Sequence, residues 1–215
     1  MVTNTIKKQR VPNSERRRSS IKSVLDSALS LFVTRGYDAT SMDDIAGQAG
    51  LTKGAVYFYF KDKLSLLEAL LLRTDKELID PIIAKIGASN GSARDRIIML
   101  TNWFAIVGAE RKELPLLHVL VSLEMHGRGN RIEEMVRKTY KDLQNAIAEV
   151  TRVGQLSGEF TSDIPPEYQA AVIVALIDGL LLEWHRRGDQ LDGRALAHGA
   201  RNMILNGIAA TRQPA

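Results

Sequence analysis

The chain has no cysteine among its 215 residues. Without cysteine there is no disulfide, no thiolate metal site and no cysteine nucleophile. No run of about eighteen apolar residues occurs, because the apolar stretch 116–125 is interrupted by His118, Ser122 and Glu124. The polar, basic N-terminus has no apolar segment of the kind found in signal peptides. We therefore expect a cytoplasmic protein with no membrane partner.

The sequence also lacks the patterns of a β-protein and of an enzyme. Strand-like alternation is absent throughout, and no repeat of about twenty to fifty residues is visible. The glycines form no phosphate-binding fingerprint. No pair with metal-ligand spacing such as His-Glu-x-x-His occurs among the four histidines, His118, His126, His185 and His198. The sequence predicts an all-α fold with no catalytic residue, no metal site and no cofactor.

Positive charge is concentrated at the N-terminal end. Residues 1–63 contain 11 Lys and Arg against 6 Asp and Glu, a net charge of +5. Residues 64–215 contain 18 against 19, a net charge of −1. This asymmetry is typical of a DNA-binding head on a body that does not contact DNA. A basic tail alone would give a similar asymmetry, because six of the eleven basic residues precede residue 19.

The segment 41–66 decides between these interpretations, because it has the pattern of a helix-turn-helix. Ser41 can cap a first short helix through its side-chain oxygen. Gly50 supplies the left-handed geometry that ends that helix, and Thr52 can cap the next one. Residues 53–55, Lys-Gly-Ala, then form a first turn with little side-chain bulk. Such a turn suits a helix that enters the major groove of DNA with its N-terminus.

The stretch from about Ser14 to Leu67 resembles the N-terminal DNA-binding domain of the TetR/AcrR family of bacterial transcriptional regulators. Many positions match in order and at fixed spacing, over roughly the first third of the chain. The matching residues are Phe32, Gly36, Tyr37, Ala39-Thr40-Ser41, Ile45-Ala46, Ala49-Gly50-Leu51-Thr52-Lys53-Gly54, Tyr57, Phe60, Lys63 and Leu67.

The resemblance implies which residues contact DNA. Lys53 matches a position that contacts the DNA backbone or base edges, and Lys63 resembles a lysine that clamps a phosphate. Tyr59 departs from the common pattern, because a histidine often stands there, so the contact at that position is open. Val56 and Phe60 are better candidates for the core. The residues expected at the DNA are Thr40, Ser41, Thr52, Lys53, Gly54, Ala55, Tyr57, Phe58, Tyr59 and Lys63.

Helical periodicity divides the chain into three parts. We expect a flexible basic arm over 1–12, a three-helix DNA-binding domain over 13–63 and a larger helical body over 64–215, with about nine helices in all. The long helix that starts near Asp62 contains Pro81, which predicts a kink or an end. Later helices are expected at 92–108, 114–126, 129–153, 166–187 and 193–210.

The body contains a candidate effector pocket around the helix expected at 114–126. That helix is apolar nearly all round, which predicts a central position, yet it carries His118 and Glu124. Isolated polar groups orient ligands in mostly apolar pockets. A dry core, with both groups facing solvent, fits the pattern equally well. The expected lining favours a hydrophobic or aromatic molecule: Trp103, Phe104, Val107, Leu117, His118, Leu120, Val121, Glu124, Leu143 and Ile147.

The last two helices are more apolar than one buried side requires. In the family that the chain resembles, these helices of each subunit pack as a four-helix bundle across a twofold axis. A purely intrachain core is the alternative. Asp178 lies in the first of the two helices, and the pattern leaves open whether it caps, lines the pocket or crosses the interface. The expected homodimer interface comprises Leu176, Gly179, Leu180, Trp184, Met203 and Ile204.

These features and the resemblance predict a one-component transcriptional regulator. We expect a ligand-responsive repressor that binds a palindromic operator in double-stranded DNA as a homodimer and associates with the bacterial nucleoid when bound. One alternative is a regulator whose body only dimerises and binds no inducer. The other is a helical enzyme or scaffold that retains a basic head, for which the body would need a convergent catalytic set.

Overall fold

The computed structural model describes residues 13–209, and all regular secondary structure within them is helical. The only strand-like feature in that range is an isolated antiparallel bridge between Phe160 and Ala209. The segments α4, η1 and α5 follow one another without a break, so counting them as one helix gives nine α-helical elements over the described range. The all-α prediction is confirmed. The flexible arm expected over 1–12 lies outside the described residues.

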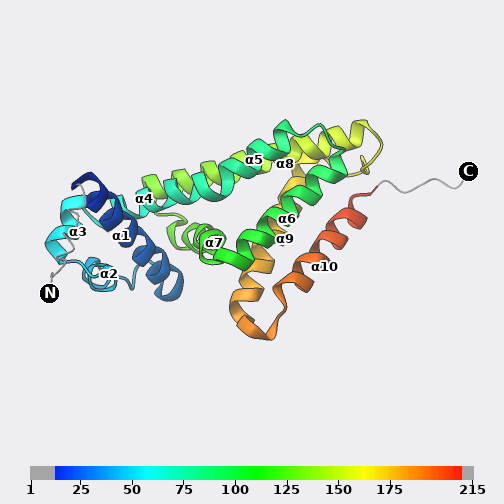
Figure 1. Cartoon of the computed structure of the whole chain (residues 1–215). Coiled ribbons are helices and arrows are strands. Elements are labelled where there is room, and N and C mark those ends of the chain that lie inside the picture. The colour runs from blue at the N-terminus through cyan, green and yellow to red at the C-terminus, as the bar shows by residue number, and fades with distance from the viewer. Residues whose placement is uncertain (1–12, 210–215) are drawn as a thin grey trace, which may run out of the picture. The chain divides into compact units, whose positions relative to one another are not determined.

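Figure 1 shows the helices in chain order. Their bounds are α1 Asn13–Arg35, α2 Met42–Ala49, α3 Lys53–Tyr59, α4 Lys63–Thr74, the π-helical segment η1 Asp75–Ile79, α5 Asp80–Ala88, α6 Ala93–Arg111, α7 Glu113–Met125, α8 Arg131–Leu156, α9 Pro166–Arg187, the 3-10 turn η2 Gly188–Gln190 and α10 Gly193–Gly207. The chain separates into two compact units, one ending at Leu67 and the other starting at Glu68.

The first unit is built from α1, α2, α3 and the start of α4. Helix α2 packs against both α1 and α3. Phe32 of α1, Ile45 of α2 and Val56 of α3 are buried together with Phe60, which follows α3. The burial of Val56 and Phe60 agrees with their predicted place in the core, and it fixes which side of α3 remains exposed.

Local capping sets the geometry of this unit as the sequence predicted. The Ser41 hydroxyl accepts from the Asp44 amide over 3.1 Å, and the Asp44 carboxylate accepts from the Ser41 amide over 2.9 Å. Gly50 ends α2 with a φ of 67°, a left-handed conformation that glycine adopts without a steric cost. The Thr52 hydroxyl then accepts from the Ala55 amide and caps α3. These three signals are local in sequence, so a single chain segment reveals them.

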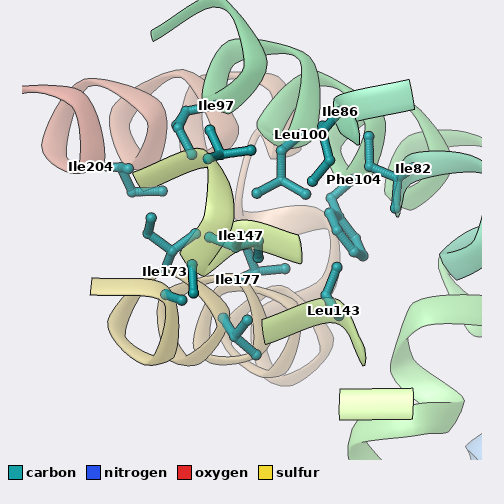
Figure 2. Close-up of a cluster of buried hydrophobic side chains, with 14 of the residues drawn as sticks. Ile82, Ile86, Ile97, Leu100, Phe104, Leu143, Ile147, Ile173, Ile177 and Ile204 are labelled. Carbon is teal, nitrogen blue, oxygen red and sulfur yellow. The ribbon is translucent and has the colours of Figure 1, made fainter. Parts of the chain in front are cut away.

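The second unit is a helical body with one large apolar core. Helix α8 packs along α9, and α6 packs against α10. Figure 2 shows side chains from α5, α6, α8, α9 and α10 converging on this core. Among them, Ile147 is fully buried and Ile204 is 6% exposed. Ser92 and Asp95 form the capping box that starts α6.

A π-helical segment lies where Pro81 predicts a kink or an end. The helix does not end there: η1 links α4 to α5 directly. The Asp80 amide donates to the Asp75 carbonyl, five residues back, which is the wider π-type spacing. The indole of Trp103 donates to the carbonyl of Leu78 over 2.8 Å. The helix from α4 to α5 is therefore continuous and contains one widened turn at η1.

Candidate functional site

One side of helix α3 is exposed to solvent. Lys53 and Gly54 are exposed at its N-terminal end, and a Cβ added at Gly54 would meet nothing within 4 Å. Tyr57 is 44% exposed and Phe58 is 76% exposed. Two aromatic rings are therefore exposed next to each other on this helix. Thr52 is exposed too, whereas Ala55 and Tyr59 are half-buried.

Lys53 carries the positive charge of this face. Its ammonium lies 2.9 Å from a carboxylate oxygen of Asp43 on α2, and both side chains are largely exposed. The hydrogen bond to Asp43 raises the pKa of Lys53 above its ordinary value, so the side chain stays charged. A solvent-exposed ion pair of this kind contributes little stability. A DNA phosphate can therefore compete with Asp43 for the ammonium.

The ammonium of Lys63 is occupied within the head. Its ammonium donates to the carbonyl oxygens of Tyr37 and Thr40, over 2.6 and 2.8 Å, and lies 4.2 Å from the centre of the Tyr37 ring. It also lies 3.4 Å from the carbonyl oxygen of Asp38. An ammonium has three hydrogens to donate. In this conformation Lys63 binds the loop between α1 and α2, and its phosphate contact stays a prediction.

Thr40 also forms its hydrogen bonds within the head. Its side chain is 1% exposed, and its hydroxyl donates to the carbonyl of Gly36 over 2.8 Å. Thr40 thus supports the loop from inside in this conformation, and its DNA contact stays a prediction. Ser41 is exposed, but its hydroxyl caps α2 by exchanging hydrogen bonds with Asp44. The exposed residues of α3 and its cap remain the candidate DNA-binding surface.

A small cavity lies inside the second unit, with a volume of about 20 Å³. A site needs roughly 10–15 Å³ to hold one water molecule, so the cavity has room for one or two. Most of its lining is apolar. The residues come from η1, α6, α7, α8 and α9: Leu78, Ile79, Phe104, Pro115, His118, Thr139, Tyr140, Leu143, Val174, Ile177, Asp178 and Leu181.

One polar pair of the second unit joins α7 to η1. The side chain of His118 is almost fully buried, and its Nε2 lies 3.2 Å from Oδ1 of Asp75. Neither atom has a hydrogen-bond partner of good geometry, nor has Nδ1 of His118. The Thr139 hydroxyl donates to the other oxygen of Asp75 over 3.1 Å. The pair is close enough to attract electrostatically but leaves hydrogen-bonding capacity unused.

A second polar pair, on α8 and α9, completes this end of the cavity. The Tyr140 hydroxyl donates to the carboxylate of Asp178. Burial raises the pKa of Asp178 to about 6, although the hydrogen bond from Tyr140 and the nearby His118 act in the opposite direction. Burial and the neighbouring Asp178 raise the pKa of Tyr140 above its ordinary range. The ambiguity about Asp178 is thus resolved by the structure: it lines the cavity.

Only part of the predicted pocket lines this cavity. Phe104, His118 and Leu143 do so. The other seven predicted residues are absent from its lining: Trp103, Val107, Leu117, Leu120, Val121, Glu124 and Ile147. Ile147 belongs to the dry core, and Trp103 and Val107 pack against that core from outside. Glu124 is half-buried near the end of α7, one and a half turns from His118, so it points elsewhere.

Sequence reasoning missed three of the polar groups. Asp75 lies in a helix that continues from the head, and Thr139 and Tyr140 lie on α8, where the sequence suggested only Leu143. Helical periodicity would have found Tyr140, because it lies three residues before Leu143 on the same face. No local signal indicates Asp75, since its Thr139 partner is 64 residues away.

A second hollow of about 60 Å³ lies between α6, α9 and α10. The Trp184 ring reaches into this region: it lies 3.3 Å from a Cβ built at Gly108 and 2.9 Å from one built at Gly193. Leu180, Trp184 and Ile204 line the hollow. These three residues were predicted at a dimer interface; Leu180 and Trp184 are only half-buried within the subunit, so their place at an interface stays a prediction. Ile204 is instead buried in the core of that subunit (Figure 2).

The outward side of α9 and α10 is apolar and uncovered within the chain. Tyr168, Val172 and Met203 are 68%, 67% and 70% exposed. Gly179 lies on the same side of α9, exposed, with nothing within 4 Å of an added Cβ. By length and composition alone α9 is apolar enough to cross a membrane, and only 22% of its most apolar window is buried. This surface, called the α9–α10 face below, carries largely exposed apolar side chains.

Comparison with known proteins agrees with this architecture. Residues 24–70 match the family described as bacterial regulatory proteins, tetR family, and residues 120–206 match the BetI-type transcriptional repressor C-terminal family. The crystal structure of the MbdR regulator from Azoarcus sp. CIB is 35% identical, covering 89% of this chain and all of that one, with a TM-score of 0.81. The chain belongs to the TetR family.

Curated relatives of this TetR-family chain are regulators over most of their length. The HTH-type transcriptional repressor BepR of Brucella suis is 26% identical over 90% of this chain and 92% of BepR. The regulator TtgR of Pseudomonas putida is 26% identical over 79% of this chain and 81% of TtgR. The chain is therefore a DNA-binding transcriptional regulator and not an enzyme. Members of its family are soluble cytoplasmic proteins that bind operator DNA.

Proposed function

We propose that this TetR-family regulator is a homodimeric repressor that binds a palindromic operator and releases it when a small apolar molecule enters the body. The exposed face of α3 carries this proposal. It combines the charge of Lys53, the bare backbone at Gly54 and the exposed rings of Tyr57 and Phe58. Val56 on the opposite side is fully buried, which anchors the helix in the head.

The chemistry of this face matches DNA. Lys53 can bind a phosphate, the Tyr57 hydroxyl can donate to another, and Ala55 can contact a thymine methyl group in the major groove. Gly54 allows the backbone of α3 to approach the base edges closely. Each subunit presents one such helix, so a twofold dimer would read two inverted half-sites. Bound to such sites, the protein would associate with the nucleoid.

A second copy of the chain is the proposed occupant of the α9–α10 face. Continuity over two helices and the exposed Val172 and Met203 favour a helical partner with the same surface, as twofold symmetry provides. Gly179 removes side-chain bulk where two helices would cross. Leu176, half-buried beside this face, is the other predicted interface residue that we retain. Of the other predicted interface residues, Ile204 is buried within the subunit, whereas Leu180 and Trp184 are half-buried beside the hollow.

The effector is proposed to bind in the cavity between η1, α6, α7, α8 and α9. Its lining of Leu78, Phe104, Leu143 and Ile177 favours a hydrophobic or aromatic body, with the polar groups orienting it. Release of DNA requires that the effector bind better to the conformation that does not fit the operator. The small volume of about 20 Å³ favours one alternative, a regulator whose body only dimerises.

The test selects bound duplexes from a randomised library and footprints them. Two inverted half-sites, protected by a protein that sediments as a dimer, would support the proposal. A single half-site bound by a monomer would refute the dimeric part. Titration of a compound library against the bound complex then separates the two forms of regulator. Release by any apolar compound supports effector control, and unchanged binding across the library supports the dimerisation-only alternative.

A further inference from the structure

The polar end of the cavity has unused hydrogen-bonding groups, among them the acceptor Oδ1 of Asp75 and the one acceptor nitrogen of the His118 ring. Both ring nitrogens of His118 and Oδ1 of Asp75 are buried without a hydrogen-bond partner of good geometry. His118 is 5% exposed, so bulk water reaches little of it. Buried polar atoms in proteins are nearly always hydrogen-bonded, and exceptions call for an explanation such as a missing ligand. His118 lines the cavity formed by η1, α6, α7, α8 and α9, and Asp75 lies 3.2 Å from it.

The charges around the cavity restrict what such a ligand can carry. Asp178 lines it, and Asp75 lies 3.2 Å from the lining residue His118, so two carboxylates stand at this end. No Lys or Arg is among the described lining residues. A ligand carboxylate or phosphate would face like charges with only His118 to offset them, which is unfavourable in a buried site. A group that donates hydrogen bonds would satisfy the acceptors instead.

The apolar end shows how the small cavity can enlarge. Phe104, Ile177 and Leu181 line both this cavity and the neighbouring hollow of about 60 Å³ between α6, α9 and α10. These three side chains therefore form the partition between the two spaces. Figure 2 shows Phe104 and Ile177 in the same cluster of buried side chains. Rotation of the Phe104 ring would join the two spaces into one elongated site that ends at Trp184.

We propose that the two spaces are one binding site for a molecule with a hydrogen-bond-donating head, a hydroxyl or an ammonium, on an apolar body. The head binds Asp75, His118 and Asp178, and the body passes Phe104 into the hollow between α6, α9 and α10. This inference rests on the proposed effector function, and it adds the chemical class of the ligand. A free carboxylate on the same body is excluded from the site.

The test uses four probes with one skeleton: 4-propylphenol, 4-propylbenzylamine, 4-propylanisole and 4-propylbenzoate. Binding to the full-length protein is measured by calorimetry and by the shift of the melting temperature. We expect the phenol or the benzylamine to bind, and the anisole and benzoate to bind at least about tenfold more weakly, because a charged acceptor loses its donor. The better of the first two identifies the head as a hydroxyl or an ammonium.

Variants locate the site. Asp75→Asn and Asp178→Asn should each weaken the better probe by about tenfold, whereas Glu124→Gln, outside the cavity lining, should leave it unchanged. Phe104→Ala, which removes the partition, should favour 4-hexyl over 4-propyl homologues. Circular dichroism checks that each variant is folded.

Three results would overturn the inference: benzoate binding as tightly as the phenol and benzylamine, equal affinities in the two aspartate variants and wild type, or no probe binding at all. Operator binding by the same preparations, measured without any probe, tests the proposed function separately. Retained operator binding with failed probe binding refutes only the ligand class.

Discussion

The ammonium of Lys63 donates to the carbonyl oxygen of Tyr37 over 2.6 Å and at the same time lies over the ring of that residue. One side chain at the start of α4 therefore fixes both the backbone and the ring of the loop that leads into α2. This relationship separates the two lysines that the sequence suggested for DNA contact. Lys53 has an exposed ammonium, whereas the ammonium of Lys63 is used inside the head.

Lys53→Ala should weaken binding to specific and random duplexes alike. The slope of log K against log salt concentration should fall by about one unit, because one phosphate contact is lost. Lys63→Ala should leave that slope unchanged and lower the stability of the head by about 1–3 kcal/mol, since two carbonyls lose a charged donor. Electrophoretic shift assays over a salt series, with thermal unfolding of each variant, measure both effects. A reduced slope for Lys63→Ala with normal stability would restore its role as a phosphate clamp.

Gly179→Arg should produce a folded monomer. An arginine fits on the subunit surface, because nothing lies within 4 Å of an added Cβ, but it would be buried without a partner between two subunits. Gly87→Arg on α5 is the matched control, since that glycine is equally open and exposed. Sedimentation should show a dimer for the control and for wild type. If Gly179→Arg remains dimeric, the α9–α10 face is not the interface, and binding of the wild type to lipid vesicles would assign the face to a membrane.

Asp178→Asn should stabilise the protein at pH 8 but not at pH 4. The pKa of Asp178 is about 6 in the folded protein against 3.8 in the unfolded chain, so the native state binds the extra proton between these values. The free energy of unfolding of the wild type is therefore highest below pH 4 with respect to this group. It falls by about 2–3 kcal/mol as the pH rises through 6. Unfolding in urea across this pH range measures the difference between wild type and variant. The groups facing Asp178 are Tyr140 and His118, and His118→Gln measures how much the imidazole contributes to the effect. A pH-independent difference between the Asp178 variant and wild type would contradict the assignment.

Gly154→Ala should destabilise the body by about 1–3 kcal/mol through overpacking. An added Cβ at Gly154 would lie 2.2 Å from the Phe160 ring, which is 3% exposed and held in the core. Gly87→Ala, in open space on α5, should instead be neutral or stabilising by up to about 1 kcal/mol, because alanine favours the helix. Chemical unfolding of both variants gives the comparison. Equal stabilities would mean that the Phe160 ring moves aside at no cost.

The sequence predicted those parts of the molecule whose causes lie close together in the chain. Ser41 finds Asp44 three residues on, Gly50 ends its own helix, and Thr52 caps the next. Helix bounds in the body followed from apolar periodicity and caps in the same way, as at Ser92. Such signals need no knowledge of tertiary contacts, and the family resemblance added the biological meaning of the pattern.

The contacts that the sequence does not show join side chains to partners that are distant in the chain. The carbonyls that accept hydrogen bonds from Lys63 lie 23 to 26 residues earlier. The sequence therefore shows a basic residue but not which groups its ammonium binds. Apolar periodicity gives a buried stripe on α9 and α10 but not whether the chain itself or a second subunit covers it. The chain itself buries Ile204, whereas it leaves Met203 exposed. The assignments of residues to the DNA-binding surface, the effector pocket and the dimer interface stay predictions.

The widened turn at η1 has a consequence for the whole helix from α4 to α5. From Thr74 onward, the most deeply buried positions of this helix recur every fourth residue, at Thr74, Leu78, Ile82 and Ile86. An unbroken α-helix advances about 100° per residue, so each step of four would overshoot the buried side by about 40°. The extra residue taken up by the π-type turn corrects this phase. The same side of the helix therefore stays against the core beyond the π-helical segment. Asp75, the first residue of that segment, faces His118 as a result.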